Sequence, residues 1–356
     1  MGQQLTKQKK NKSETQQIGE LVARRYPAEW EKQRATWLSW PHNKKEWGKR
    51  RLGEIKEFYK KLIATILQFQ DVNLILANED LVGEDNYPRI HNGKGYKLKK
   101  IIIPNNDIWI RDYGPFFLAP SFLVDFEFNA WGGKFPPWDL DNQVPKSIAL
   151  YLGQKIESYP IILEGGAIEF SGNGLILTTE QCLLNKNRNS NLNKKEIESI
   201  LKSVFNIEEV IWLKRGLEGD HTDGHIDDVA RFVSQNKIVI CKSDDTKDKN
   251  YEHLNESIKY LKSWRHPKKS YKLEIIELPM PDRIKFKKKR LPNSYSNFIF
   301  VNGGIIVPTF NCEADKKALA IFKKLFPDRK IVGINCSLLI EEGGGIHCMT
   351  KQEPLI

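Results

Sequence analysis

The sequence lacks the features that mark membrane, secreted and disulfide-rich proteins. No stretch of its 356 residues reaches the roughly 18 consecutive apolar residues of a membrane-spanning helix. The amino terminus, MGQQLTKQKKNKS, has no apolar segment and does not read as a secretory signal peptide. The five cysteines are scattered and form no CxxC pair, which argues against a disulfide framework and against structural zinc. These absences favour a cytoplasmic protein.

The chain carries a net charge of +11, which raises the question of nucleic-acid binding. The basic residues, however, gather in runs that resemble solvated loops or tails. No aromatic residues are interleaved with them at a spacing that suits base stacking. The runs cover residues 7–12, 94–100, 265–272 and 285–290. We therefore expect no nucleic-acid partner. A non-catalytic protein that binds RNA or an anionic membrane is the distant alternative.

Residues 1–18 read as a disordered basic tail, and residues 19–356 as a single domain. Gly2 with Thr6 matches the pattern for N-myristoylation, and lysines follow closely. Membrane tethering through Gly2 is therefore an alternative to a free tail.

The periodicity after the tail predicts short strands that alternate with single helices, with no linker between them. The predicted helices cover residues 18–25, 53–68, 194–205, 250–264 and 314–326. The predicted strands include residues 36–40, 71–77, 98–103, 159–163, 175–178, 209–213, 229–233, 237–241, 298–301, 305–307 and 331–333. The pattern indicates an α/β protein. Polar residues at the strand ends recur at roughly regular intervals, which hints at a radially repeated unit.

Cys348 stands out because three glycines, an isoleucine and a histidine precede it in the run EGGGIHC. Glycine lets the backbone approach a ligand closely, so a thiol in this setting is within reach of that ligand. A buried, inert thiol is the commoner alternative for a cysteine. The local sequence favours a nucleophile.

The segment GDHTDGHIDDVARFV, residues 219–233, holds the densest set of polar residues. His225 and Asp227 stand two positions apart, so an extended segment would present both on one face. Such a pair suits proton transfer next to a cation. His221 and His225 also have the HxxxH spacing of a zinc site, but the glycines argue against the helix that this site requires.

Two further carboxylates follow predicted strands: Asp112 in the block NNDIWIRDYGP and Glu164 in EGG. Each one alone is compatible with a structural ion pair or a turn. Together with a thiol and an imidazole they indicate a cationic substrate, because the planar N–H pairs of a guanidinium match carboxylates. A thiolate could then attack the central guanidinium carbon.

Several ordered blocks of the chain resemble the agmatine deiminases, in the peptidylarginine-deiminase-like branch of the guanidine-modifying superfamily. The blocks are PAEW, TWLSWPHN, NDIWIRDYGP, EGG, TTEQCLLN with NRN, TDGHID and GGGIHC, and they span about residues 27–354. The resemblance implies a five-bladed α/β propeller of ββαβ-type units with the active site at its axis. It implies no metal and no organic cofactor.

The resemblance also implies roles for individual residues. Cys348 would be the nucleophile, His225 the general acid and then base, and Glu164 the residue that orients His225. The substrate-binding residues would be Asp112, Asp227, Trp109 and Asn302. The implied reaction is hydrolysis of agmatine to N-carbamoylputrescine and ammonia through an S-amidino-cysteine, in putrescine biosynthesis. Arginine or peptidylarginine deimination is the alternative activity, and a homodimer stays open.

Overall fold

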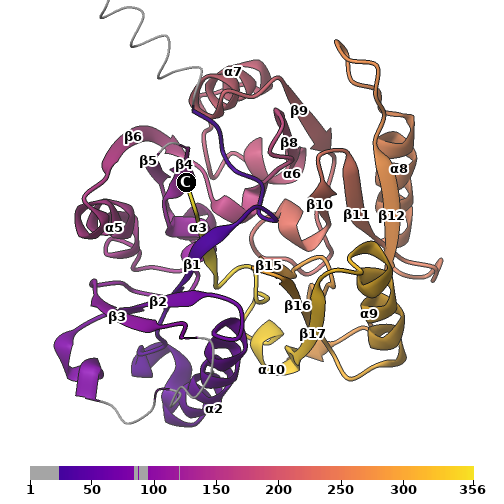
Figure 1. Ribbon diagram of the computed structural model, residues 1–356. Coiled ribbons are helices and arrows are strands. Elements are labelled where there is room, and N and C mark those ends of the chain that lie inside the picture. The colour runs from indigo at the N-terminus through magenta and orange to yellow at the C-terminus, as the bar shows by residue number, and fades with distance from the viewer. Residues whose placement is uncertain (1–23, 84–86, 88–94, 120) are drawn as a thin grey trace, which may run out of the picture.

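The computed structural model describes residues 24–356, apart from 84–86, 88–94 and 120 (Figure 1). The predicted tail 1–18, with Gly2, and most of the predicted helix 18–25 lie outside these residues. Strands and helices alternate along the described chain, as predicted for an α/β protein. No helix in this part of the chain is long and apolar enough to cross a membrane.

The described strands form five sheets of three or four strands and one small hairpin. The first sheet has the order β18-β1-β2-β3, with β1 Gln33–Ser39, β2 Asp71–Leu76, β3 Leu98–Ile102 and β18 Lys351–Pro354. The second and third are β4 Phe116–Leu118, β5 Phe122–Glu127, β6 Lys155–Ile162 and β7 Ile168–Phe170, β8 Leu175–Thr179, β9 Glu209–Leu213. The fourth and fifth are β10 Ala230–Ser234, β11 Lys237–Lys242, β12 Glu274–Pro279 and β15 Ile299–Val301, β16 Gly304–Thr309, β17 Lys330–Asn335. The hairpin pairs β13 Lys285–Phe286 with β14 Lys289–Arg290.

Every one of the five sheets contains an antiparallel pair followed by a parallel neighbour. A parallel neighbour requires a crossover connection, which a helix usually supplies. The crossover helices are α2 Lys44–Ile66, α5 Val144–Leu152, α7 Lys194–Phe205, α8 Tyr251–Ser263 and α9 Glu313–Leu325. Figure 1 shows them at the periphery of the molecule, outside the sheets.

The long amphipathic helices are confirmed close to their predicted bounds. In α7, the Asn193 side chain accepts from the amides of Lys195 and Glu196, and Glu196 returns a bond to the Asn193 amide. The predicted helix 53–68 lies mostly within α2, whose regular part begins after Gly48, where φ is 66°. Short elements were not predicted. They are α3 Ile110–Tyr113, α4 Ala130–Gly133, α6 Glu180–Leu183, α10 Ser337–Ile340, and the 3-10 turns η1 Glu79–Gly83, η2 Asp141–Gln143, η3 Gly165–Ala167 and η4 Ile226–Asp228.

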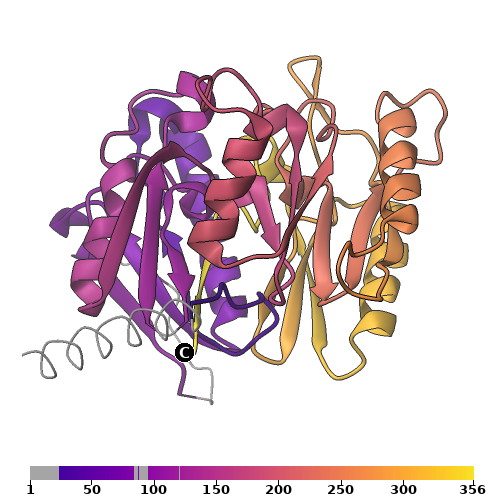
Figure 2. The same ribbon diagram turned by 90° about the horizontal axis from the view of Figure 1, so that it is seen from above.

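The last strand, β18, completes the first sheet by pairing antiparallel with β1. Ala35 faces Glu353 and Trp37 faces Lys351 in this register. The two ends of the described chain are therefore neighbours, as Figure 2 shows at the label C. Because Cys348 lies three residues before Lys351, β18 fixes the position of the predicted nucleophile.

Neighbouring sheets pack through aromatic side chains. Phe116 contacts Phe126 of its own sheet and Phe170 of the next, at ring distances of 5.5 and 6.3 Å. Phe205 of α7 lies 5.2 Å from Phe116 and 4.9 Å from Phe170. Rings in such edge-to-face contacts hold the two sheets in a fixed relation. The strand ends that carry the polar residues are thereby fixed as well.

Candidate active site

Cys348 lies in the loop between α10 and β18, and the glycines before it let this loop pack closely. A Cβ atom at Gly344 would lie 2.5 Å from the ring of Trp109, and one at Gly345 would lie 2.2 Å from Asn297 Oδ1. Gly343 has a φ of +107°, which side chains rarely adopt. The three glycines are therefore required by close contacts and backbone conformation.

The Cys348 thiol is 8% exposed and is surrounded by hydrogen-bond donors and carboxylates. Asn297 Nδ2 lies 3.2 Å from Sγ and the Gly345 amide 3.4 Å from it. Asp227 Oδ2 lies 3.9 Å from Sγ. Burial, with Asp227 and Asp228 nearby, holds the pKa of Cys348 well above its usual value. The thiol is therefore protonated when the site holds no cation.

Asp112, His225 and Asp227 converge on one glycine. A Cβ atom at Gly166 would lie 2.6 Å from His225 Nδ1, 2.9 Å from Asp112 Oδ1 and 3.1 Å from Asp227 Oδ2. The Gly166 amide donates to Asp112 Oδ1 at 2.8 Å. The absence of a side chain at Gly166 leaves these three polar groups facing one another. The predicted grouping of Asp112, His225 and Asp227 is thus present in the fold.

The local structure of the His225 segment differs from the prediction. His225 precedes the 3-10 turn η4, and Asp227 lies within that turn, so the predicted extended segment is wrong. The amides of Gly224 and His225 donate to Asp220 Oδ2 at 2.9 and 3.0 Å, which fixes the turn. His225 and Asp227 still face the same side, because both approach Gly166.

The pKa values of Asp112 and Asp227 are shifted in opposite directions. Burial raises the pKa of Asp112 to about 6, and Asp227 adds to the rise although His225 opposes it. Trp131 Nε1 donates to Asp112 Oδ2 at 2.9 Å. Burial also disfavours the charged form of Asp227, but the hydrogen bond from His347 and the nearby charges of His347, His225 and Arg231 together outweigh it and lower the pKa of Asp227. Asp227 Oδ1 is buried and has no hydrogen-bond partner among the described residues.

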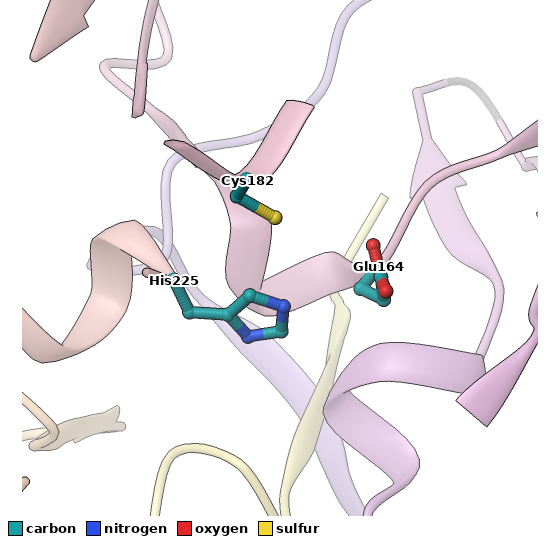
Figure 3. A group of neighbouring side chains, drawn as sticks. All are labelled: Glu164, Cys182 and His225. Atoms are coloured by element: carbon teal, nitrogen blue, oxygen red, sulfur yellow. The ribbon is translucent and has the colours of Figure 1, made fainter. Parts of the chain in front are cut away.

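Glu164 lies behind the ring of His225. One Glu164 oxygen, the Cys182 sulfur and one His225 nitrogen all lie within 4.8 Å of one another (Figure 3). Glu164 Oε2 and His225 Nε2 are both buried without a hydrogen-bond partner in the described structure. Burial lowers the pKa of His225, but Asp112, Cys182 and Glu164 outweigh it and hold this pKa well above the usual value. His225 can therefore hold a proton.

Two groups of donor atoms have the composition of a metal site. They are Glu164, Cys182, His225 and Asp227, Asp228, Cys348. The guanidinium of Arg188 already donates to Glu164 Oε1 at 2.6 Å, and its charge would repel a second cation in the first group. Neither group includes His221, so the HxxxH pair is not part of a donor cluster in the described structure.

Of the two other predicted substrate-binding residues, Trp109 packs against the loop that carries Cys348, whereas Asn302 bonds to Gln33. Trp109 is buried, and its ring lies against Gly344 in the loop that carries Cys348. Asn302 lies in the turn between β15 and β16, where its Oδ1 accepts from the Gln33 amide at 2.9 Å and its Nδ2 donates to the Gln33 carbonyl at 2.7 Å. The asparagine that contacts Cys348 is Asn297, from the same sequence block.

The sequence analysis also missed a buried series of hydrogen bonds that leads from Asp227 through His347 to Glu29. His347 contacts Asp227 Oδ2 through Nδ1 at 2.7 Å and Glu29 Oε2 through Nε2 at 2.9 Å. Arg231 donates to the same Glu29 oxygen at 2.6 Å, and the Phe300 amide donates to Glu29 Oε1 at 3.0 Å. Glu29 belongs to the block PAEW and His347 to GGGIHC, but only the resemblance drew attention to these blocks.

A cavity of about 590 Å³ opens beside this site. Trp131, which bonds to Asp112, also forms part of its wall. The other lining residues include Phe128, Lys134, Phe135, Pro136 and Trp138. The cavity therefore borders the tryptophan that bonds to Asp112, and its walls combine aromatic side chains with polar and charged ones.

Known proteins match this chain over most of its length. The sequence profile of the Porphyromonas-type peptidyl-arginine deiminase family matches residues 25–354. A putative agmatine deiminase from Legionella pneumophila is 36% identical over 333 residues, covering 92% of this chain and 94% of that protein. The agmatine deiminase of Pseudomonas putida is 33% identical over 356 residues, covering 92% and 95%.

Solved structures of agmatine deiminases resemble the fold of this chain. A serine variant of the C. jejuni agmatine deiminase, with substrate bound, has a TM-score of 0.84 and 33% identity, and the match covers 93% of this chain and 96% of that one. The agmatine deiminase of Enterococcus faecalis has a TM-score of 0.84 and 31% identity, covering 94% and 96%. The chain belongs to the Porphyromonas-type peptidyl-arginine deiminase family, together with these agmatine deiminases.

Proposed function

We propose that this protein hydrolyses agmatine to N-carbamoylputrescine and ammonia, as a hydrolase acting on a guanidino C–N bond. The observation that carries the proposal is the buried Cys348 thiol beside Asp227, whose Oδ1 is free to accept a hydrogen bond. A thiol among carboxylates is poorly suited to a neutral carbonyl. It suits a guanidinium, whose charge offsets the carboxylates and whose carbon is the electrophile.

The first half of the reaction forms an S-amidino group on Cys348. Asp112 and Asp227 accept hydrogen bonds from the guanidinium, and the bound cation favours loss of the Cys348 proton to solvent. The thiolate forms a C–S bond with the guanidinium carbon to give a tetrahedral adduct. Protonated His225 then gives its proton to one nitrogen, the C–N bond breaks, and ammonia leaves. The S-amidino group remains on Cys348.

The second half restores the thiol. His225, now neutral, takes a proton from water, and the hydroxide oxygen bonds to the amidino carbon. The C–S bond then breaks, the leaving sulfur takes the proton of the added hydroxyl group, and the neutral ureido product departs from the restored thiol. Glu164, close to the His225 ring, would orient it and stabilise its charged form. Trp109 would contribute by supporting the loop that carries Cys348.

Agmatine differs from arginine in lacking the α-carboxylate, and the aromatic side chains in the cavity, Trp131 among them, can pack against an aliphatic chain. The decisive experiment measures ammonia released from agmatine, free arginine and an arginine-containing peptide in parallel. We expect agmatine to give the highest kcat/KM. Activity on arginine or on the peptide alone would refute agmatine as the substrate and favour arginine or peptidylarginine deimination. Salt-sensitive RNA binding without deimination would refute the proposed enzymatic activity.

We also propose that the five sheets are the blades of an α/β propeller within one catalytic domain, residues 19–356. The shared pairing pattern of the sheets and the completion of the first sheet by β18 support this arrangement. A cytoplasmic location, a free rather than myristoylated Gly2, and a homodimer are the accompanying proposals. Intact-mass measurement and light scattering on the full-length protein test the last two.

A further inference from the structure

Lys351, the first residue of β18, is a lysine that the fold removes from water. Its exposed fraction is 1%, although lysine is among the residues least often found inside a protein. Its Nζ donates to the Arg111 carbonyl at 3.1 Å and lies 4.1 Å from the centre of the Phe116 ring. An amine that gives up its hydration needs a compensating contact. The bond to Arg111 is that contact.

The Arg111 carbonyl needs a donor because its own helix, α3, cannot supply one. In a helix this oxygen would accept from the amide four residues later, but that residue is Pro115, which has no N–H. The Gly114 amide donates to the Ile110 carbonyl at 2.9 Å. A buried carbonyl that is left without a donor destabilises the fold. Lys351 supplies the missing donor from β18.

The other polar groups of Arg111 are bound by the same carboxyl-terminal segment. The Arg111 amide donates to the Cys348 carbonyl at 3.1 Å, and Nε donates to the His347 carbonyl at 3.1 Å. Its Nη1 donates to Gln352 Oε1 at 2.6 Å. With the lysine on its carbonyl, Arg111 is held through both backbone groups and through its guanidinium. The residue that follows it in the chain is Asp112.

A third segment of the backbone meets the same carbonyl. A Cβ atom at Gly165 would lie 2.0 Å from the Arg111 oxygen and 2.8 Å from Lys351 Nζ. The amide of the next residue, Gly166, donates to Asp112 Oδ1 at 2.8 Å. The Lys351 bond therefore lies at the point where the segment of Asp112, the segment of its donor Gly166 and the strand β18 come together.

An amine suits this place because it can donate without carrying a full charge. Burial lowers the pKa of Lys351 well below its usual value, and the charge of Arg111 lowers it further, although Asp112 and Glu29 oppose the change. The neutral amine is thereby favoured, and it keeps its N–H donors. It adds no positive charge beside a carboxylate that is to bind a guanidinium.

We propose that Lys351 is a positioning residue that holds the peptide group between Arg111 and Asp112, and so sets the place of the Asp112 carboxylate relative to the Cys348 thiol. This inference rests on the proposed binding of the guanidinium by Asp112. Lys351 bonds to the backbone and acts on the substrate only through Asp112. The same four-residue strand thus follows the nucleophile and places a carboxylate that receives the substrate.

The first test is hydrogen–deuterium exchange of the full-length protein without substrate, followed by mass spectrometry. Lys351→Met keeps a side chain of similar length, removes the donor and no longer buries an amine, so the protein should fold. The amides of residues 109–114 and 165–167 should exchange about 10-fold faster, as expected when a buried carbonyl loses its donor.

Two further variants keep this test specific. Glu353→Gln changes another buried residue of β18, which accepts from Trp37 Nε1 at 2.9 Å and from Asn73 Nδ2 at 3.1 Å. It should leave exchange around Asp112 at the wild-type rate. Lys351→Gln keeps a neutral donor on a shorter side chain, so its exchange should lie between that of the wild type and that of Lys351→Met.

The second test is the pH profile of kcat/KM, whose acid limb we assign to Asp112. When the peptide group before it shifts, Asp112 loses the Gly166 donor, and a carboxylate with fewer donors has a higher pKa. In Lys351→Met the limb should therefore move to higher pH by about one pH unit, and kcat/KM above the limb should fall about 10-fold, mainly through KM. A smaller amount of folded protein would lower kcat and leave the limb in place.

Wild-type exchange around Asp112 in Lys351→Met, or an acid limb that does not move, would overturn the inference. Equal acceleration in the sheet of β10, β11 and β12 would also overturn it, because that result indicates general loosening of the fold. Exchange needs no substrate. Faster exchange confined to residues 109–114 and 165–167, in a protein that does not deiminate agmatine, would therefore refute the proposed substrate and keep the positioning role of Lys351.

Discussion

His347 Nδ1 lies 2.7 Å from Asp227 Oδ2, so this aspartate is held by one oxygen while Oδ1 stays free. The imidazole is held in turn by Glu29 at 2.9 Å. A carboxylate with one fixed oxygen presents the other in a defined direction, which is what bidentate recognition of a guanidinium requires. In the proposed mechanism, His347 therefore orients Asp227 for the substrate without contacting the substrate itself.

Replacing His347 by Gln should weaken substrate binding more than chemistry. Loss of a hydrogen bond to a charged group costs about 1.5–3 kcal/mol, so kcat/KM should fall about 10- to 100-fold, mainly through KM. Steady-state kinetics separate the two constants. His266→Gln changes another buried histidine, which packs on Trp264 and Tyr271, and should leave both constants unchanged. An effect on kcat alone would assign His347 a different role.

Cys348→Ala should abolish turnover, with a loss in kcat of about 10⁴-fold or more, because the covalent step has no other nucleophile. The variant should still bind agmatine, since Asp112 and Asp227 remain. Ammonia release and calorimetric binding measure the two properties. In the wild-type protein, acid quenching during turnover should leave an amidino adduct on Cys348, detectable by mass. Near-normal activity of Cys348→Ala would refute the mechanism.

Asp112→Asn and Asp227→Asn should each lower kcat/KM about 100- to 1,000-fold, because a buried carboxylate facing a cation is replaced by a neutral amide. Circular dichroism should show a folded protein in both cases. Asp125→Asn is the matched control: Asp125 is a buried aspartate of β5 that bonds to Ser158, outside the site. Equal loss in all three variants would indicate damage to the fold.

The activity should decline on the acid side because of Asp112. Its pKa of about 6 lies above the usual value, so the carboxyl group becomes protonated and neutral as the pH falls through 6. The neutral form cannot attract a guanidinium, and kcat/KM should fall about tenfold per pH unit below this point. Bound substrate favours the carboxylate, so the decline in kcat should occur at lower pH.

Trp131→Phe sharpens this prediction. The indole N–H donates to Asp112 and lowers its pKa, so removing that donor should move the acid limb of kcat/KM to higher pH. The phenyl ring keeps an aromatic wall in the cavity. A profile that does not change in this variant, or one that is flat from pH 7 to 5 in the wild type, would show that Asp112 does not control the limb.

Local sequence patterns predicted the elements that local physics determines. Helices such as α7 and α9 were found because their apolar residues recur at helical spacing and polar groups cap their ends. The extended segment at His225 was wrong because Asp220 imposes a turn through hydrogen bonds to the backbone that spacing does not reveal. The short helices α3 and α10 were missed because four residues carry too little periodicity.

In the candidate site, too, some residues were predicted from the sequence and others were not. Cys348, His225, Asp112 and Asp227 were predicted from residue type and motif, and the structure brings them together. Asn302 was predicted to bind substrate, but the asparagine of this block that contacts the thiol is Asn297, which only the three-dimensional structure shows. The contact of His347 with Glu29 joins residues 318 positions apart. Contacts of that range depend on how sheets assemble and are not encoded in any local pattern.

The pairing of β18 with β1 has a consequence for truncated forms of the protein. The strand that completes the first sheet consists of residues Lys351–Pro354, and Cys348 lies just before it. A protein truncated before Lys351 would keep Cys348 but lose the strand that anchors its loop to the first sheet, so we expect such a product to be inactive.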